Sequence, residues 1–171
     1  MAKNAKEMLR QKARAWYGVP VDITVSSDHW HRVVVPGLAL PHPGLVNLFA
    51  RWGLPADERL ALTYRHELGH LQTLPVPLVH LLLILWTRRG RRGGSRWLRA
   101  LVGLLAHQAV WELAAESYVV TTTRYGRSRS RSTVGRTIYA LLWSGMAFLA
   151  AAGTAFLIHR PASPTNESFS S

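Results

Sequence analysis

His66-Glu67-Leu68-Gly69-His70 is the stretch of sequence that decides which fold to expect. It has the form HExxH, in which two histidines stand about one helical turn apart and share one face of a helix. Both imidazoles can then bind a single Zn²⁺, while Glu67 acts as general base on the zinc-bound water. Roughly one shuffled chain in a hundred would contain this pattern by chance, so the rest of the chain has to supply a third ligand.

Few carboxylates follow the motif and can complete a catalytic zinc site, which needs three protein ligands and an open position. They are Glu112, Glu116 and Glu167. Glu167 lies in the tail 159–171, whose composition predicts disorder. Glu112 and Glu116 share one helix face, so one can bind the metal while the other orients a ligand histidine. Two solvent-exposed glutamates are the plainer alternative, but carboxylates in so apolar a run are rarely left unpaired.

The same residues exclude two other classes of zinc protease. A metzincin would carry glycine and a third histidine where Thr73 and Val76 stand. An intramembrane protease of the site-2 class takes its third ligand from a downstream aspartate, and the last aspartate in this chain is Asp57. The remaining pattern is a gluzincin, with a glutamate ligand on a second helix. His107 is the reserve third ligand if Glu112 faces away from the histidines.

The motif, the apolar segment after it, and Glu112-x-x-Ala115-Glu116 together resemble the membrane metalloproteases of the CAAX prenyl protease and HtpX heat-shock class. That family carries HExxH, two membrane helices and then ExxxD. The resemblance covers roughly residues 20–125. It implies that Glu112 is the third zinc ligand and that Glu116 replaces the family's supporting aspartate. We find no clear match to the family's later histidine and arginine, which help to stabilise the oxyanion.

Composition and charge narrow the class of protein further. The chain has 171 residues, no cysteine and a net charge of +12, which excludes disulfides, a thiolate nucleophile and a cysteine-type zinc site. Arginines cluster at 88–99 and at 124–136, beside apolar segments. This arrangement favours contact with anionic lipid headgroups over specific nucleic-acid binding, for which a recognisable fold motif is lacking.

The 22 residues of Thr137–Ile158 contain no charge. As a helix they would cover about 33 Å, enough to cross a hydrocarbon core of about 30 Å. The segment 75–111 offers two shorter apolar arms of about 16 and 18 Å, which predicts a hairpin that dips into the membrane or packs against the transmembrane helix. The family resemblance implies two full spans instead. Five arginines at 124–136 predict that the site faces the cytoplasm, as in a bacterial inner-membrane protein, with the tail outside.

The N-terminal third predicts a small β-unit ahead of the motif. Residues 2–16 suggest a basic amphipathic helix, and Val21–Val25 pairs with Arg32–Val35 in a hairpin. The second of these strands would be an edge on which a peptide substrate could pair. The prolines and glycines of 36–44 predict a loop. A helix begins after Pro55 and carries HExxH near its middle.

These elements predict an α+β, mainly α fold. It has a minimal zincin core of the gluzincin type, a small β-hairpin, an apolar helical hairpin and a C-terminal transmembrane helix. The metallopeptidase domain would cover 1–136 with the insertion 75–111, followed by the transmembrane helix 137–158 and the tail 159–171.

The predicted function is hydrolysis of peptide bonds by a membrane-associated zinc metallopeptidase. One Zn²⁺ per chain would be held by His66, His70 and Glu112, and a peptide or protein would be the substrate. Membrane lipids are the other expected partner, and the oligomeric state is not readable. The alternative is a catalytically inactive membrane adaptor that keeps the fold and binds anionic lipid or a protein partner. Candidates to polarise the scissile carbonyl are Tyr118, Arg124, Tyr125 and Tyr139.

Overall fold

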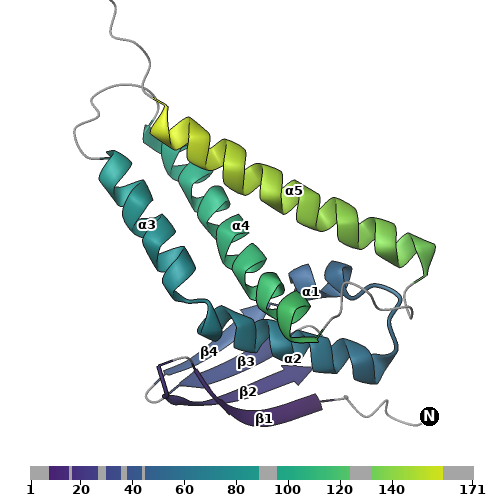
Figure 1. The fold of residues 1–171 in the computed structure, drawn as a ribbon. Coiled ribbons are helices and arrows are strands. Elements are labelled where there is room, and N and C mark those ends of the chain that lie inside the picture. The colour runs from purple at the N-terminus through teal and green to yellow at the C-terminus, as the bar shows by residue number, and fades with distance from the viewer. Residues whose placement is uncertain are drawn as a thin grey trace, which may run out of the picture.

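The computed structural model describes residues 8–15, 17–26, 30–35, 38–43, 45–88, 96–123 and 132–159, which form a mainly helical α+β fold (Figure 1). Within these residues, strands come first and helices follow. The strands are β1 (Met8–Arg14), β2 (Pro20–Ser26), β3 (Trp30–Val35) and β4 (Leu38–Pro43). The helices are α1 (Leu45–Ala50), α2 (Ala56–Gln72), α3 (Pro75–Arg88), α4 (Arg96–Thr123) and α5 (Thr133–Ile158).

The strands form one antiparallel sheet in the order β1-β2-β3-β4. The predicted pairing of β2 with β3 is confirmed, with Ile23 opposite Val33. Three other expectations are wrong. Residues 8–14 are a strand and not part of a helix, residues 38–43 are a strand and not a loop, and β3 lies between β2 and β4 instead of at an edge.

Both misread segments depend on long-range pairing. β1 is held by β2, with Leu9 opposite Val25 and Ala13 opposite Val21, and this pairing joins residues that local sequence patterns cannot relate. β4 contains Pro41 and Pro43, residues that suggest a loop because they lack a backbone donor. An edge strand tolerates such residues, since one side of its backbone has no partner strand.

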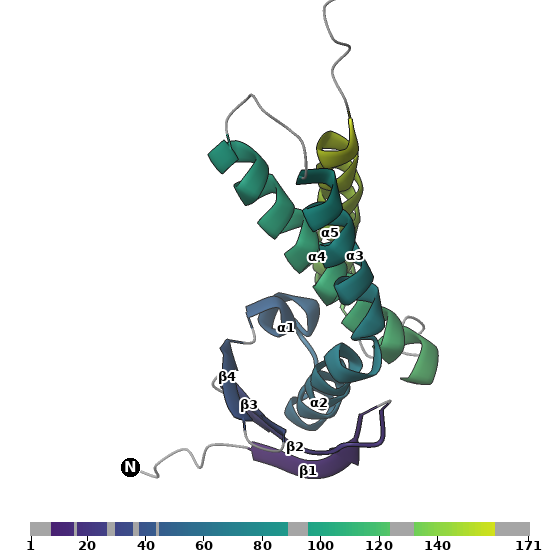
Figure 2. The ribbon, with the colours of Figure 1, turned by 90° about the vertical axis from the view of Figure 1, so that its left-hand side faces the viewer.

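Helix α2 lies across the sheet and connects it to the remaining helices (Figures 1 and 2). It begins after Pro55 with two acidic residues in its first turn and ends before Pro75, as the sequence predicts. Leu60, Tyr64, Leu68 and Leu71 face the sheet and pack with the buried side chains of β2. Because these residues recur at helical spacing, the opposite face of α2 presents the motif histidines. The motif occupies the last two turns of α2, not its middle.

Helices α3, α4 and α5 form a layer that extends away from α2 on the side opposite the sheet (Figures 1 and 2). α4 packs on α2 with its C-terminal half and also packs against α5. Small residues allow the close approach to α5, because a Cβ added to Gly153 would lie 2.7 Å from the Cβ of Ala106.

Helix α5 is the helix of the described part of the chain that is long and apolar enough to cross a membrane by itself. Only 22% of its most apolar window is buried, whereas the core helix of a soluble protein would be mostly covered. The bent pair α2–α3, with an angle of 53°, passes the same test if it is taken as one span. However, α2 packs against the sheet with one face, so we assign α2 to the domain core.

The apolar hairpin reaches further than the sequence suggested. Its second arm is one continuous helix of 28 residues that carries both glutamates. A Cβ added to Gly103 near the start of α4 would lie 3.7 Å from Leu157 in the last turn of α5. The hairpin therefore packs against α5, as expected, but extends to the far end of α5 instead of stopping halfway.

Large apolar side chains cover the outer faces of this helical layer. In α3 they are Val76, Val79, Leu82, Leu85 and Trp86; in α4, Trp97, Leu98, Leu101, Leu104 and Leu105; in α5, Leu141, Phe148 and Phe156. Many large exposed apolar side chains on neighbouring helices are typical of proteins that contact a membrane or a partner.

Candidate metal site

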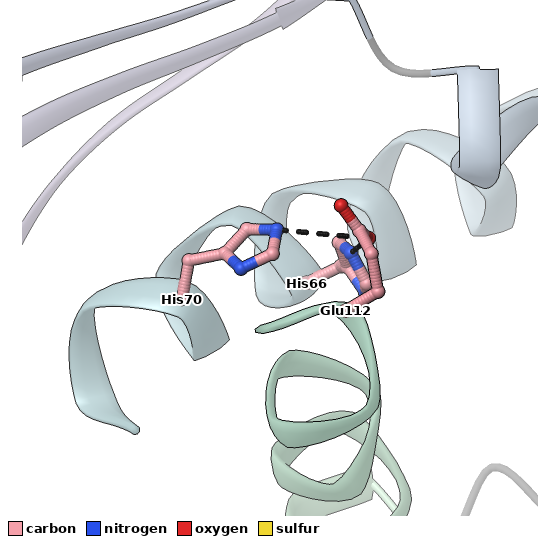
Figure 3. A group of neighbouring side chains, drawn as sticks. All are labelled: His66, His70 and Glu112. Atoms are coloured by element: carbon pink, nitrogen blue, oxygen red, sulfur yellow. Dashed lines mark hydrogen bonds and ion pairs between the residues drawn. The ribbon is translucent and has the colours of Figure 1, made fainter. Parts of the chain in front are cut away.

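The site forms where α4 crosses the C-terminal half of α2. Glycine is required at the crossing, since a Cβ on Gly69 would lie 2.6 Å from the backbone oxygen of Ala115. This close approach brings the histidines of α2 opposite Glu112 of α4 (Figure 3). Gly69, the second x of the HExxH motif, thus allows α2 and α4 to pack closely.

His66, His70 and Glu112 point toward one another and form a buried group that could hold a metal ion. Each offers one ligand atom, and these atoms lie within 4.8 Å of one another. The Nε2 atoms of His66 and His70 lie 3.0 and 3.9 Å from Oε2 of Glu112. Ligand atoms of a tetrahedral zinc site lie about 3.3–3.6 Å apart, given bonds of about 2.0–2.2 Å. Small side-chain movements would therefore suffice to hold an ion, and two imidazoles with one carboxylate are a donor set that zinc accepts.

The second carboxylate oxygen of Glu112, Oε1, accepts a hydrogen bond within α4. Gln108, one turn earlier on α4, donates from Nε2 to Oε1 of Glu112 at 2.8 Å. The carboxylate is therefore fixed so that Oε2, the oxygen nearest both histidines, faces the possible metal position.

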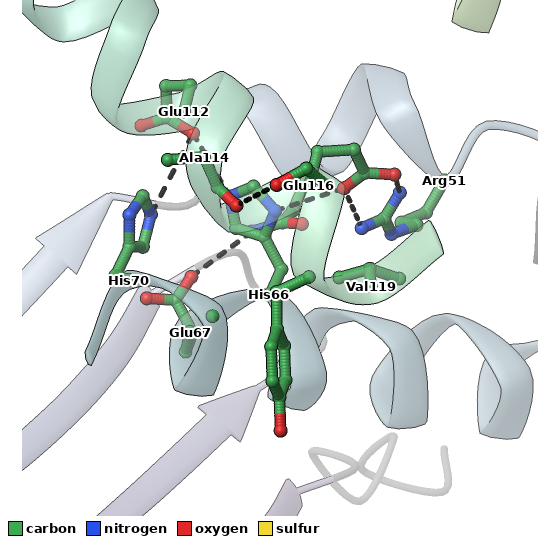
Figure 4. Close-up of polar contacts among 12 residues, drawn as sticks. Arg51, His66, Glu67, His70, Glu112, Ala114, Glu116 and Val119 are labelled. Carbon is green, nitrogen blue, oxygen red and sulfur yellow. Dashed lines mark hydrogen bonds and ion pairs between the residues drawn. The ribbon is translucent and has the colours of Figure 1, made fainter. Parts of the chain in front are cut away.

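Glu116 contacts the far side of His66, as the sequence predicts for one of the motif histidines. Its Oε2 lies 3.1 Å from Nδ1 of His66. Arg51 donates to both of its oxygens at 2.7 and 2.6 Å, and the Tyr139 hydroxyl donates to Oε1 at 2.8 Å. Figure 4 shows Glu116 between His66 and the guanidinium group. The Glu116 carboxylate thus joins α2, α4, α5 and the residue that follows α1.

The charges around His66 favour its protonated form in the absence of a metal. Burial lowers the pKa of His66, but hydrogen bonds to Glu112 and Glu116 raise it to about 9. For Glu116 the two effects have the opposite sign. Burial raises its pKa, and hydrogen bonds from His66 and Arg51 lower it to about 2. A metal ion at Nε2 would replace one imidazole proton, and the Nδ1 proton could still be donated to the ionised Glu116.

Glu67 is 2% exposed and lies beside the two histidines (Figure 4). Asn47 of α1 donates from its Nδ2 atom to Oε1 of Glu67 at 3.1 Å. A buried carboxylate next to a possible metal position is suitably placed to take a proton from a reacting water.

Several residues of the site were missed in the sequence: Asn47, Arg51, Gln108 and Trp143. The ring of Trp143 lies 6.2 Å from that of His66 between centroids. Asn47 and Arg51 are polar residues four positions apart in an apolar stretch, and Gln108 precedes Glu112 by four. This spacing on one helix face was the available signal. Which face turns toward the motif depends on tertiary packing and is not encoded locally.

The other candidates have different outcomes. Tyr139 reaches the site, where its hydroxyl donates to Glu116. Arg124 and Tyr125 lie outside the described residues, and a role of Tyr118 stays a prediction. His107 does not belong to the metal-holding group. Its ring stacks on that of His80, with the two Nδ1 atoms 3.4 Å apart.

Comparisons with known proteins found no match for this chain among family models, curated proteins or solved structures.

Proposed function

We propose that this protein is a membrane-associated zinc metallopeptidase of the gluzincin type. The observation that carries the proposal is the convergence of His66, His70 and Glu112 on one buried point. Glu67, which directly follows His66 in the motif, lies beside this point (Figure 4). The resemblance of the motif to the CAAX prenyl protease and HtpX class supports the same reading.

The proposed reaction adds water to a peptide carbonyl and then breaks the carbon–nitrogen bond. When bound, Zn²⁺ would supply Lewis acidity that lowers the pKa of water to about 7. Glu67 takes the proton from the attacking water and delivers it to the departing amine. Glu116 holds the ring of His66 through Nδ1, while Gln108 fixes the orientation of Glu112. Each of these supporting contacts keeps a ligand in one orientation.

Metal removal tests this function. The full-length chain, purified in detergent, is expected to contain one zinc per chain and to cleave fluorescein-labelled casein. Phenanthroline should abolish the cleavage, and added zinc should restore it. His70→Ala and Glu112→Ala should each bind zinc at least about 10-fold more weakly, because two ligands hold the ion poorly. Asp57→Asn, an exposed change on the same helix, is the control. Full zinc content in Glu112→Ala would refute the ligand assignment.

We further propose that α5 spans a membrane and that the helical layer around it lies among lipids. The low burial of α5 and the exposed apolar faces of α3 and α4 support this placement. Five arginines at 124–136 support an orientation with the site in the cytoplasm. The six arginines of 88–99 weigh against that orientation, because α4 reaches the far end of α5. Most of both runs lies outside the described residues.

Cysteine labelling in this naturally cysteine-free chain separates the orientations. Single cysteines replace Ser95, Ser130 and Ser170, positions that lie outside the described residues. With the site in the cytoplasm, a membrane-impermeant maleimide added to intact cells should label positions 95 and 170 but not 130. Labelling at 130 alone would show that the orientation is inverted. Labelling at 170 alone would show that the hairpin stops within the membrane.

A further inference from the structure

Asn47 is a buried amide that contacts the proposed base. Asn47 is 3% exposed and Glu67 is 2% exposed. The Nδ2 atom of Asn47 lies 3.1 Å from Oε1 of Glu67. The contact joins residues 20 positions apart in the chain, so it depends on the tertiary packing of α1, which contacts α5.

The direction of the Asn47 amide follows from the chemistry of the pair. An ionised carboxylate only accepts hydrogen bonds, so the nitrogen of the amide must face Glu67. The Oδ1 atom then points elsewhere, and in the described part of the chain it is buried without a hydrogen-bond partner. A buried acceptor in this state reduces stability. Packing alone would favour an apolar side chain here, so packing does not explain the amide.

The segment that carries Asn47 contacts two carboxylates of the site. Arg51 lies four residues later, and its backbone N–H donates to the Asn47 carbonyl oxygen at 3.0 Å, which continues the helical turn. The Arg51 side chain binds Glu116 while the Asn47 side chain binds Glu67. One helical turn therefore orients both the carboxylate behind His66 and the proposed base.

We infer that Asn47 is a positioning residue for Glu67. By donating to Oε1, the amide restricts rotation of the Glu67 carboxylate and so holds the proposed base in one orientation. The inference rests on the proposed peptidase function, because it assigns Glu67 the role of base. General bases act only when they are held within hydrogen-bond reach of the proton.

The first test observes the contact without relying on catalysis. The chain contains three asparagines, Asn4, Asn47 and Asn166, so [¹⁵N]asparagine labelling gives three side-chain amide pairs in the NMR spectrum. Asn47→Ala assigns one pair by its loss. In the zinc-loaded protein, that pair should exchange slowly with water and have one downfield proton. Glu67→Ala should move this proton upfield, and an unchanged resonance would overturn the inference.

The second test separates positioning from stability. Asn47→Ala should lower kcat for casein peptides about 10- to 100-fold, as loss of a supporting contact of a metal site typically does. Its KM and zinc content should stay close to those of the wild type. Asn47→Ala removes the donor, so near-wild-type activity in this variant would overturn the inference.

Two further variants complete the design. Asn47→Leu removes the amide and keeps the number and branching of the side-chain heavy atoms, so it should keep the unfolding temperature while kcat falls about 10- to 100-fold. In a Glu67→Gln background, Asn47→Ala should cause no further loss; an additive loss would overturn the inference. A zinc-loaded wild type that cleaves no peptide would refute the proposed function, and with it the role of Asn47. Equal activity in the wild type and in Asn47→Ala refutes the role of Asn47 alone.

Discussion

Replacing Glu67 by glutamine is expected to lower kcat/KM for peptide cleavage about 100- to 10,000-fold, the usual contribution of a general base. Glutamine keeps the size of the side chain and can still accept the Asn47 hydrogen bond through its carbonyl oxygen. It cannot take a proton from water at neutral pH. Zinc content should stay at one per chain, because Glu67 is not among the residues that converge on the metal position.

The measurement compares initial rates of casein cleavage with zinc content in the same preparations. Asp57→Asn removes an exposed carboxylate from the first turn of the same helix and should leave both values unchanged. If Glu67→Gln retains wild-type cleavage, the mechanism is wrong. A wild type that binds zinc but cleaves nothing would favour the alternative of a catalytically inactive adaptor.

Replacing Arg51 by methionine is expected to destabilise the protein by about 3–5 kcal/mol, the typical cost of leaving a buried charge without its partner. The Arg51 side chain is 0% exposed and the Glu116 side chain 5% exposed. Loss of the guanidinium leaves the Glu116 carboxylate with His66 and Tyr139 as partners among the contacts described above. Metal affinity should fall as well, since Glu116 orients His66.

Equilibrium unfolding in detergent, followed by circular dichroism, measures the loss. The double variant Arg51→Met/Glu116→Gln should be less destabilised than Arg51→Met alone, because it removes both charges. Arg10→Met is the matched control, since the pair of Arg10 with Asp22 has its arginine 70% exposed and such pairs contribute little. Equal effects of the buried and the exposed change would contradict the structure.

The candidate metal group was predictable because few residues after the motif can act as a third ligand. After His70 the chain has three carboxylates, and only two of them stand in an apolar helical run. The bounds of α2 were equally readable, since Pro55 and Pro75 flank it. In such cases a residue type by itself restricts either the backbone or the ligand set.

The parts that could not be predicted depend on packing between distant segments. The pattern of β1 fits an amphipathic helix as well as a strand, and pairing with β2 decides between them. Asn47 and Arg51 reach Glu67 and Glu116 only through the tertiary packing of their segment. The length of α4 was underestimated because apolar and charged stretches were assigned separately, although one helix runs through both.

The contact between Tyr139 and Glu116 bears on whether α5 and the rest of the protein are separable units. Tyr139 lies in the first part of α5 and donates to the carboxylate that also holds His66 and Arg51. A fragment that ends at the expected domain boundary, residue 136, would lack this donor and the Trp143 ring beside His66. Helix α5 thus contributes side chains to the candidate metal site, so the helix and the site are expected to be inherited together, not exchanged as separate parts.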